Sequence, residues 1–81
     1  RYAGASAEVI ESQVTKPLED SIAGIDAVDV ITSISRAEQA QISVRFRLEK
    51  DADAAAAEVR DRTSRVRNRL PQAIEEPVIA K

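Results

Sequence analysis

Hydrophobic residues recur at helical spacing through the second half of the chain. At about 100° per residue, one face between Asp51 and Pro71 collects the mostly apolar positions Ala52, Ala56, Val59, Thr63, Val66 and Leu70. Asp51 is a residue type that caps helix N-termini, an alanine-rich run follows it, and Pro71 ends the pattern. The sequence therefore predicts a helix over residues 51–70 with that face turned toward the core.

The opposite face of this predicted helix carries only short side chains, and we call it the small-residue stripe. Its members, spaced 4, 4, 3 and 4 residues apart, are Asp53, Ala57, Asp61, Ser64 and Asn68. Arginines lie on both flanks, and the i,i+4 spacing predicts the ion pairs Glu58–Arg62 and Asp61–Arg65. Two interpretations remain open: a solvent face of chance composition, or a face that packs closely against another copy or lines a narrow passage.

A second helix is predicted over residues 6–23. Ser6 is a good N-cap, and inward positions follow at spacings of 4, 4 and 7 residues: Ile10, Val14, Leu18 and Ile25. Pro17 lies inside the helix and costs about 3 kcal/mol there, so a kink or a break into two short helices is expected. Gly24 is expected to end the helix in a left-handed conformation.

Two strands are predicted between the helices, over residues 28–35 and 41–48. The first is β-branched but its facing is ambiguous, because Val28, Val30 and Ile34 share one parity and Ile31 has the other; a bulge and burial on both faces stay open. The second alternates cleanly, with Gln41, Ser43, Arg45 and Arg47 outward and Ile42, Val44, Phe46 and Leu48 inward. The connection lacks Asn-Gly or Asp-Gly, so we expect a hairpin loop longer than two residues.

The order of these elements indicates an α+β fold. Tyr2 could end a first strand, and residues 77–81, with Val78 and Ile79, could start a last one. Completing both strands gives β-α-β-β-α-β, the ferredoxin-like plan, truncated here to α-β-β-α with remnants of the first and last strands. Residues 1–81 would then be a single truncated subdomain whose helices cover one face of the sheet.

Composition and charge exclude several functions. The net charge of −2 argues against a general polyanion binder, so no nucleic-acid partner is expected. The absence of Cys and His removes thiol chemistry and the usual acid/base residue, so we expect no catalytic residue, no cofactor and no metal site. No apolar run is long enough to span a bilayer, and the start at Arg1 without Met suggests a piece of something longer.

An ordered set of segments carries a family resemblance across essentially all 81 residues: YAGAS, VTKPLED, AGID, ITSIS, ISVRFRL, DADAAAAEVRDRTSRVRNRLP and PVIAK. The chain resembles the first porter subdomain of resistance–nodulation–division (RND) efflux pumps, in the hydrophobe/amphiphile-exporting branch. One departure is Tyr2-Ala3-Gly4, where the family has Tyr-Pro-Gly.

The resemblance implies a proton-driven homotrimeric transporter of the bacterial inner membrane, with this segment in the periplasm. It also implies small amphiphilic substrates, a periplasmic adaptor protein and an outer-membrane channel as partners. Matched residue by residue, the small-residue stripe corresponds to the pore-facing side of a helix at the trimer axis. The substrate-path sheet face corresponds to Gln41, Ser43, Thr32 and Ser33. Arginines flanking Asp61 are hypothesised to pair between subunits.

Two other classes of function fit less well. A small ferredoxin-like RNA- or protein-binding module would, for RNA, stack bases on aromatic residues of the sheet, but Phe46 is expected to face inward. A small hydrolase would need a glycine-rich loop or a nucleophile with its base, and the only glycines are Gly4 and Gly24. For the isolated chain we expect no transport and no catalysis, and we expect self-association through open sheet edges.

Overall fold

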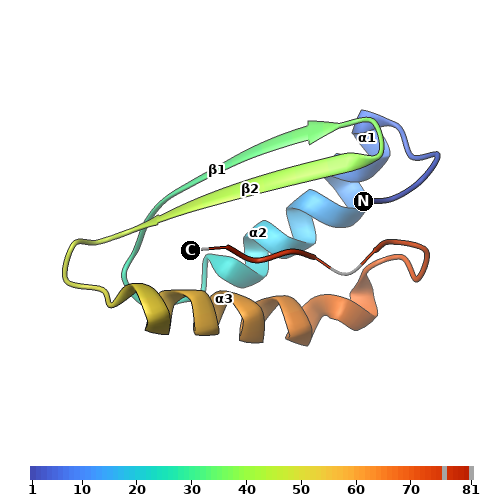
Figure 1. Cartoon of the computed structure of the whole chain (residues 1–81). Coiled ribbons are helices and arrows are strands. Elements are labelled where there is room, and N and C mark those ends of the chain that lie inside the picture. Colours follow the sequence, from blue (N-terminus) through green and yellow to red (C-terminus); the bar gives the residue numbers. More distant parts are fainter. Residues whose placement is uncertain (76, 81) are drawn as a thin grey trace.

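The structure is a computed structural model that describes residues 1–75 and 77–80. Its elements in chain order are α1 (Ala7–Ile10), η1 (Glu11–Thr15), α2 (Lys16–Ile22), β1 (Val28–Arg36), β2 (Gln39–Phe46), α3 (Ala52–Val66) and η2 (Arg67–Arg69). The two strands form an antiparallel sheet with the helices on one side of it (Figure 1). The predicted α+β class is confirmed, whereas the ferredoxin-like completion stays a prediction.

The first helical region runs without a gap from Ala7 to Ile22. The Ser6 hydroxyl accepts a hydrogen bond from the Val9 N–H at 3.2 Å, as expected of an N-cap. Between α1 and α2, η1 is π-helical, and the Lys16 N–H donates to the Glu11 carbonyl five residues back. Pro17 follows in the first turn of α2, where a missing N–H is tolerated. The helix therefore accommodates this proline by changing its hydrogen-bond pattern.

The end of α2 differs from the expectation for Gly24. Among the described residues, the only glycine with a positive φ is Gly4, at 81°, and the left-handed residue between α2 and β1 is Ala27, at 70°. Ala27 is buried, and its carbonyl accepts a hydrogen bond from the Arg47 N–H at 2.8 Å. Gly24 is thus not a left-handed stop, and a contact with α3 described below accounts for a glycine at this position.

A β-bulge settles which way the first strand faces. The strands pair from Val28↔Phe46 to Arg36↔Gln39, with a register shift between Val28 and Val30. Because the bulge inserts one residue, the alternation reverses there, so Val28 and Ile31 are half-buried while Val30 and Ile34 are 40% and 44% exposed. Of the two alternatives left open by the sequence, the bulge is confirmed.

The hairpin turn is tighter than predicted. Only Ala37 and Glu38 link the two strands, so the expectation of a longer loop is wrong. Glu38 has a φ of 65° and is held from outside the hairpin: its N–H donates to the Ala5 carbonyl at 2.8 Å, and its carbonyl accepts from the Tyr2 N–H at 2.9 Å. These contacts from the N-terminal segment hold Glu38 in a left-handed conformation that glycine would adopt without steric cost.

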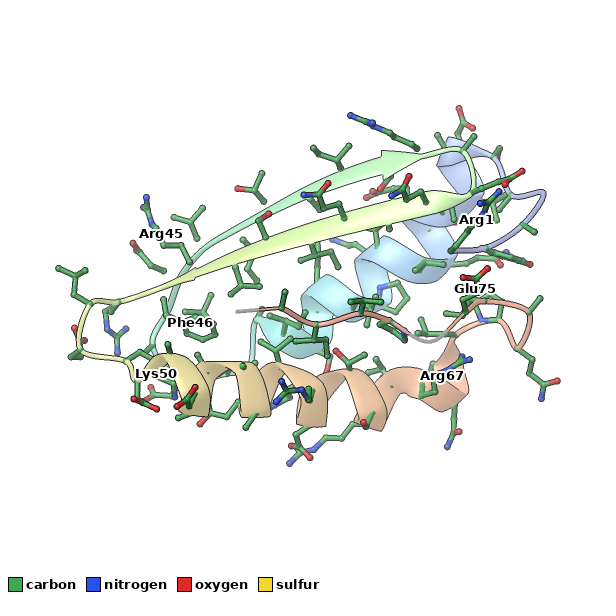
Figure 2. All side chains as sticks on the ribbon, in the orientation of Figure 1. Arg1, Arg45, Phe46, Lys50, Arg67 and Glu75 are labelled. Carbon is green, nitrogen blue, oxygen red and sulfur yellow. The ribbon has the colours of Figure 1, made fainter. Side chains whose placement is uncertain are left out.

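Strand β2 also begins and ends earlier than predicted. Its alternation is confirmed as far as Phe46, which points toward the helices while Arg45 points to the opposite side of the sheet (Figure 2). Leu48 was expected to face inward but lies beyond the strand in the connection to α3 and is fully exposed. A period-2 pattern does not show where pairing with the partner strand stops.

The main core lies where the first helical region, the end of α3 and both terminal segments meet. Its buried members are Ala5, Ile10, Val14, Leu18, Val66, Leu70 and Ile74. Ala52, expected on the core face of α3, is exposed because it is the first residue of the helix. Residues 77–80 form no strand, so the predicted start of a strand over 77–81 is wrong for its described part; Lys81 lies outside the described residues. These residues do not pair with β2.

Candidate functional site

The small-residue stripe is exposed along its whole length. Its first four residues lie on α3 and Asn68 lies on η2, and all five are classed as exposed. The residues of α3 that are buried lie on its other side: Ala55, Ala56, Thr63 and Val66. The helix therefore has the two opposed faces that its periodicity predicts, although exposure alone does not assign a role to the stripe.

The charge on the stripe is partly neutralised within α3 itself. Asp61 and Arg65 form the predicted i,i+4 ion pair at 2.8 Å, with both side chains more than half exposed. The predicted pair between Glu58 and Arg62 does not form. Instead, Glu58 pairs with Lys50 at 2.7 Å, and the Arg62 guanidinium donates to the Gly24 carbonyl at 3.2 Å.

The Lys50–Glu58 pair is the most sheltered ion pair among the described residues, with the Lys50 side chain only 13% exposed. It ties the connection after β2 to the second turn of α3. Asp51 begins the helix one residue later, and its carboxylate accepts from the Ala54 N–H at 2.9 Å. Together these contacts fix where α3 starts relative to the sheet.

The outer face of the sheet holds three of the four residues predicted for a substrate path. Thr32, Gln41 and Ser43 are exposed; Thr32 lies opposite Ser43, and Gln41 lies opposite Ile34. Ser33 is a correction, because it faces the helices and its hydroxyl donates to Glu19 Oε2 at 3.1 Å. Successive strand residues point to opposite faces, so Thr32 and Ser33 could not both line one surface.

The two arginines expected to extend this outer face separate in the structure. Arg45 remains on β2 and pairs with Asp29 at 3.1 Å. Arg47 lies beyond the strand and forms an exposed ion pair with Glu49 at 2.8 Å. The Arg47 guanidinium, through its hydrogen bond, lowers the pKa of the Glu49 carboxyl.

A polar seam between β1 and the first helical region was not foreseen. Thr15 is fully buried, and its Oγ1 lies 2.8 Å from Ser35 Oγ, which in turn donates to Glu11 Oε2 at 2.8 Å. The signal in the sequence is the i,i+4 spacing of Glu11, Thr15 and Glu19, matched by the alternate strand positions of Ser33 and Ser35. The seam orients β1 on the helix.

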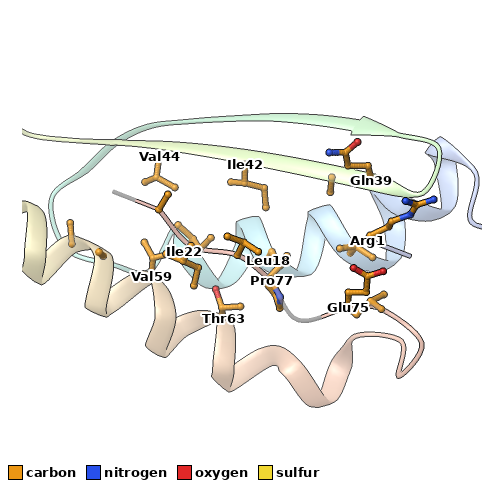
Figure 3. A pocket seen from close by; sticks show the side chains of 18 of the residues that line it. Arg1, Leu18, Ile22, Gln39, Ile42, Val44, Val59, Thr63, Glu75 and Pro77 are labelled. Atoms are coloured by element: carbon orange, nitrogen blue, oxygen red, sulfur yellow. The ribbon is translucent and has the colours of Figure 1, made fainter. Parts of the chain in front are cut away.

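A largely apolar cleft of about 940 Å³ separates the inner face of β2 from α3 (Figure 3). Ile42 and Val44 line it from the strand, Leu18 and Ile22 from the helix behind, and Val59 from α3. The C-terminal residues 77–80 also line the cleft, running between the sheet and α3 in Figure 1, and Val78 is 95% exposed. The sheet and α3 are thus incompletely packed along the free edge of β2.

No helix within residues 1–75 and 77–80 combines the length and apolar character needed to cross a membrane. Within the same residues, no group of three or more acidic side chains could hold a metal ion.

Comparison with known proteins places the chain in a family. The sequence profile described as the AcrB/AcrD/AcrF family matches residues 1–81. A Haemophilus influenzae protein named as an uncharacterized transporter is 35% identical over 79 residues, which cover 98% of this chain and 8% of the relative. The swarming motility protein SwrC of Bacillus subtilis is 31% identical over 80 residues, which cover 99% of this chain and 7% of the relative.

The chain therefore spans less than a tenth of these relatives, and neither relative's name denotes an enzyme. The profile match along the full 81 residues confirms the resemblance drawn from the ordered segments. This chain belongs to the AcrB/AcrD/AcrF family.

Proposed function

We propose that this chain is the first periplasmic porter subdomain of a proton-driven RND transporter that exports drugs or other amphiphiles. In this proposal α3 is the pore helix, and three copies of it meet at the axis of a homotrimer. The observation that carries the proposal is the exposed small-residue stripe on α3, at the positions that the resemblance matches to the pore.

Close approach of three helices needs short side chains at the contact. Helix axes pack 8–10 Å apart, and the distance depends on the side chains between them. Long cations on the stripe would hold the helices apart and repel one another. The ion pair between Asp61 and Arg65 of the same helix lowers the repulsion that three Asp61 carboxylates would otherwise create at the axis.

The outer sheet face is the second part of the proposal. Thr32, Gln41 and Ser43 offer hydroxyl and amide groups, and the neighbouring Val30 and Ile34 are partly exposed apolar side chains. A surface that mixes apolar area with a few polar groups suits amphiphilic molecules. This face would form part of the path between subdomains, while substrate choice would be shared with the rest of the transporter.

The apolar cleft supports the ferredoxin-like completion of the fold. Strands supplied by the rest of the chain would pair with the free edge of β2 and cover Ile42, Val44 and Val59. In the intact transporter the subdomain would lie in the periplasm, with an adaptor protein and an outer-membrane channel as partners. Without those strands, a second copy can occupy the same edge.

Placing a long cation on the stripe tests the proposed function. In the full-length transporter, Asp61→Lys should reduce substrate efflux from cells at least about tenfold, because three ammonium groups would meet at the axis and a tenfold change needs only about 1.4 kcal/mol. Asp20→Lys is the matched control, since Asp20 is an exposed acid of α2 away from the stripe. Equal efflux in the two variants, at equal expression, would show that the stripe does not face the axis.

A further inference from the structure

A pair of reciprocal contacts joins the end of α2 to the middle of α3. The Arg62 guanidinium donates to the Gly24 carbonyl at 3.2 Å. In the other direction, the Ser21 hydroxyl donates to the Arg62 carbonyl at 3.1 Å. Arg62 is therefore bonded through its side chain to Gly24 and through its backbone to Ser21. We call these three residues, Arg62, Gly24 and Ser21, the latch.

The absence of a side chain at Gly24 makes room for this contact. A Cβ atom at Gly24 would lie 2.7 Å from Arg62 Nη1 and 3.3 Å from Arg62 Cζ. Since Gly24 has no positive φ, the left-handed conformation does not explain the glycine. The glycine is explained by the guanidinium, which occupies the space that a side chain at position 24 would need. An alanine here would push the end of the arginine side chain away from the carbonyl without clashing with the backbone.

The neighbouring arginine shows that the latch is specific to one residue. Arg60 is exposed and makes no ion pair or hydrogen bond with any residue that the structure describes. Arg62 is half-buried and turned toward α2. The two arginines flank Asp61 symmetrically in the sequence, so the hypothesis of pairing between subunits treated them alike, whereas the structure engages Arg62 within its own subunit.

The core face of α3 alone defines the rotation of this helix weakly. Its buried residues are two alanines, a threonine and a valine, which are small and give few interlocking contacts. In addition, the first half of α3 borders the open cleft. Shape complementarity therefore fixes the rotation of α3 about its axis only weakly. The directional hydrogen bonds of Arg62 supply a further constraint on this rotation.

We propose that Arg62 is a positioning residue of the pore helix: through Gly24 and Ser21 it fixes the rotation of α3 that turns the small-residue stripe toward the trimer axis. The inference rests on the proposed function, because it concerns how the stripe is aimed. It assigns Arg62 a role inside the subunit and couples the orientation of the stripe to the position of α2.

Cysteine cross-linking in the full-length transporter measures this orientation. Ala57 lies on the stripe and Ala54 lies beside it; both are exposed alanines of α3, so Ala57→Cys and Ala54→Cys are matched probes. The readout is the ratio of intersubunit cross-linking at position 57 to that at position 54. The ratio is then measured again with Arg62→Ala, Gly24→Ala, both together, or Arg60→Ala as the charge-matched control.

We expect Arg62→Ala and Gly24→Ala each to lower the ratio about fivefold, the factor that one hydrogen bond's usual net contribution represents. Arg60→Ala should leave it unchanged. The double variant should be no worse than either single variant, because the contact is already lost. If the Arg62→Ala variant does not accumulate in the membrane, the Gly24→Ala variant alone tests the inference. A ratio lowered about fivefold supports the inference, and an unchanged ratio contradicts it.

Two results would overturn the inference separately from the proposed function. If Ala57→Cys cross-links well with the latch intact but Gly24→Ala and Arg62→Ala leave the ratio where Arg60→Ala leaves it, the latch does not orient α3. The same holds if the effects of the two single variants multiply in the double variant. If Ala57→Cys fails to cross-link even with the latch intact, the proposed function itself is wrong, and the inference falls with it.

Discussion

Among the residues that the structure describes, two other than glycine hold a left-handed backbone conformation, and each directly precedes a strand. Ala27, with a φ of 70°, precedes β1, and Glu38, with a φ of 65°, precedes β2. This conformation costs an L-residue roughly 1–2 kcal/mol. At Glu38 the N-terminal segment offsets the cost with two backbone hydrogen bonds and an ion pair between Arg1 and Glu38 at 2.6 Å.

Substitution at Glu38 separates the backbone cost from the ion pair. Glu38→Gly and Glu38→Ala both remove the carboxylate, but only glycine removes the steric cost of the left-handed conformation. We expect the glycine variant of the 81-residue chain to be more stable than the alanine variant by about 1 kcal/mol, measured by urea unfolding. Equal stability of the two variants would mean that the turn relaxes to another conformation.

The same residue predicts a dependence of stability on pH. A hydrogen bond from Arg1, a second from the Gly4 N–H and the charge of Arg1 lower the pKa of the Glu38 carboxyl in the folded state. As pH falls, the unfolded chain binds this proton first, so the contribution is full above the unfolded pKa and is lost toward the lowered folded pKa.

Thermal unfolding as a function of pH checks this sign. In the Glu38→Gln variant, the melting temperature should fall less steeply as the pH is lowered, because the carboxyl that takes up the proton is absent. Glu8→Gln serves as the control, because Glu8 is exposed and has no ion-pair partner among the described residues. An acid-side profile that keeps its slope in Glu38→Gln would contradict the account.

At the scale of elements, the helix α3 was the most predictable part of the chain. Its cap and its two faces follow from local sequence signals, and the stripe is exposed as the 3.6-residue repeat requires. The predicted end at residue 70 is less accurate, because the α-helix stops at Val66 and the 3-10 helix Arg67–Arg69 follows. What could not be predicted depends on contacts distant in sequence. The tight turn at Glu38 relies on residues 1–5, and the contact of Arg62 with Gly24 replaced an i,i+4 pair that looked equally plausible.

The strand elements show the same division. Alternation in β2 gave the correct faces, but the exposed Leu48 shows that the end of a strand depends on where its partner ends. In β1, the bulge changes which parity is outward, so the misplaced Ser33 could not be separated from Thr32 by sequence alone. Parity within a strand is local information, whereas register is not.

We expect the isolated chain to self-associate, because the free edge of β2 leaves backbone groups that can pair with another copy. This edge borders the apolar cleft, whereas the polar seam links β1 to the first helical region. Light scattering should show dimers or larger species at about 0.5 mM, since unpaired edges and exposed apolar surface drive association in this concentration range.

A lysine on the edge strand tests this directly. Ser43→Lys should shift the chain toward monomer, because charges on an edge strand oppose further pairing. Both strands of this two-stranded sheet have an unpaired edge, so Thr32→Lys, which places the same charge opposite Ser43 but on β1, tells pairing through β2 from pairing through β1. Monomer at every concentration in the unsubstituted chain, or an equal effect of both lysines, would argue against pairing through β2.

At the scale of the whole molecule, the sheet face and the small-residue stripe lie on opposite sides of the subunit. The sheet lies on one side, α3 lies on the other, and the cleft between them is crossed by the C-terminal segment (Figure 1). The latch ties α2 to α3, and the polar seam ties the first helical region to β1. The first helical region is thus bonded to the sheet on one side and to α3 on the other.

The distance between copies of the stripe tests the central claim most directly. With a nitroxide label on Ser64→Cys in the full-length transporter, electron paramagnetic resonance should show strong dipolar broadening between subunits, because helix axes that pack 8–10 Å apart around the trimer axis would bring the three labels close together. Asp20→Cys, labelled in the same way on α2, should show clearly weaker broadening. Broadening at Ser64 no stronger than that at Asp20 would contradict the placement of α3 at the trimer axis.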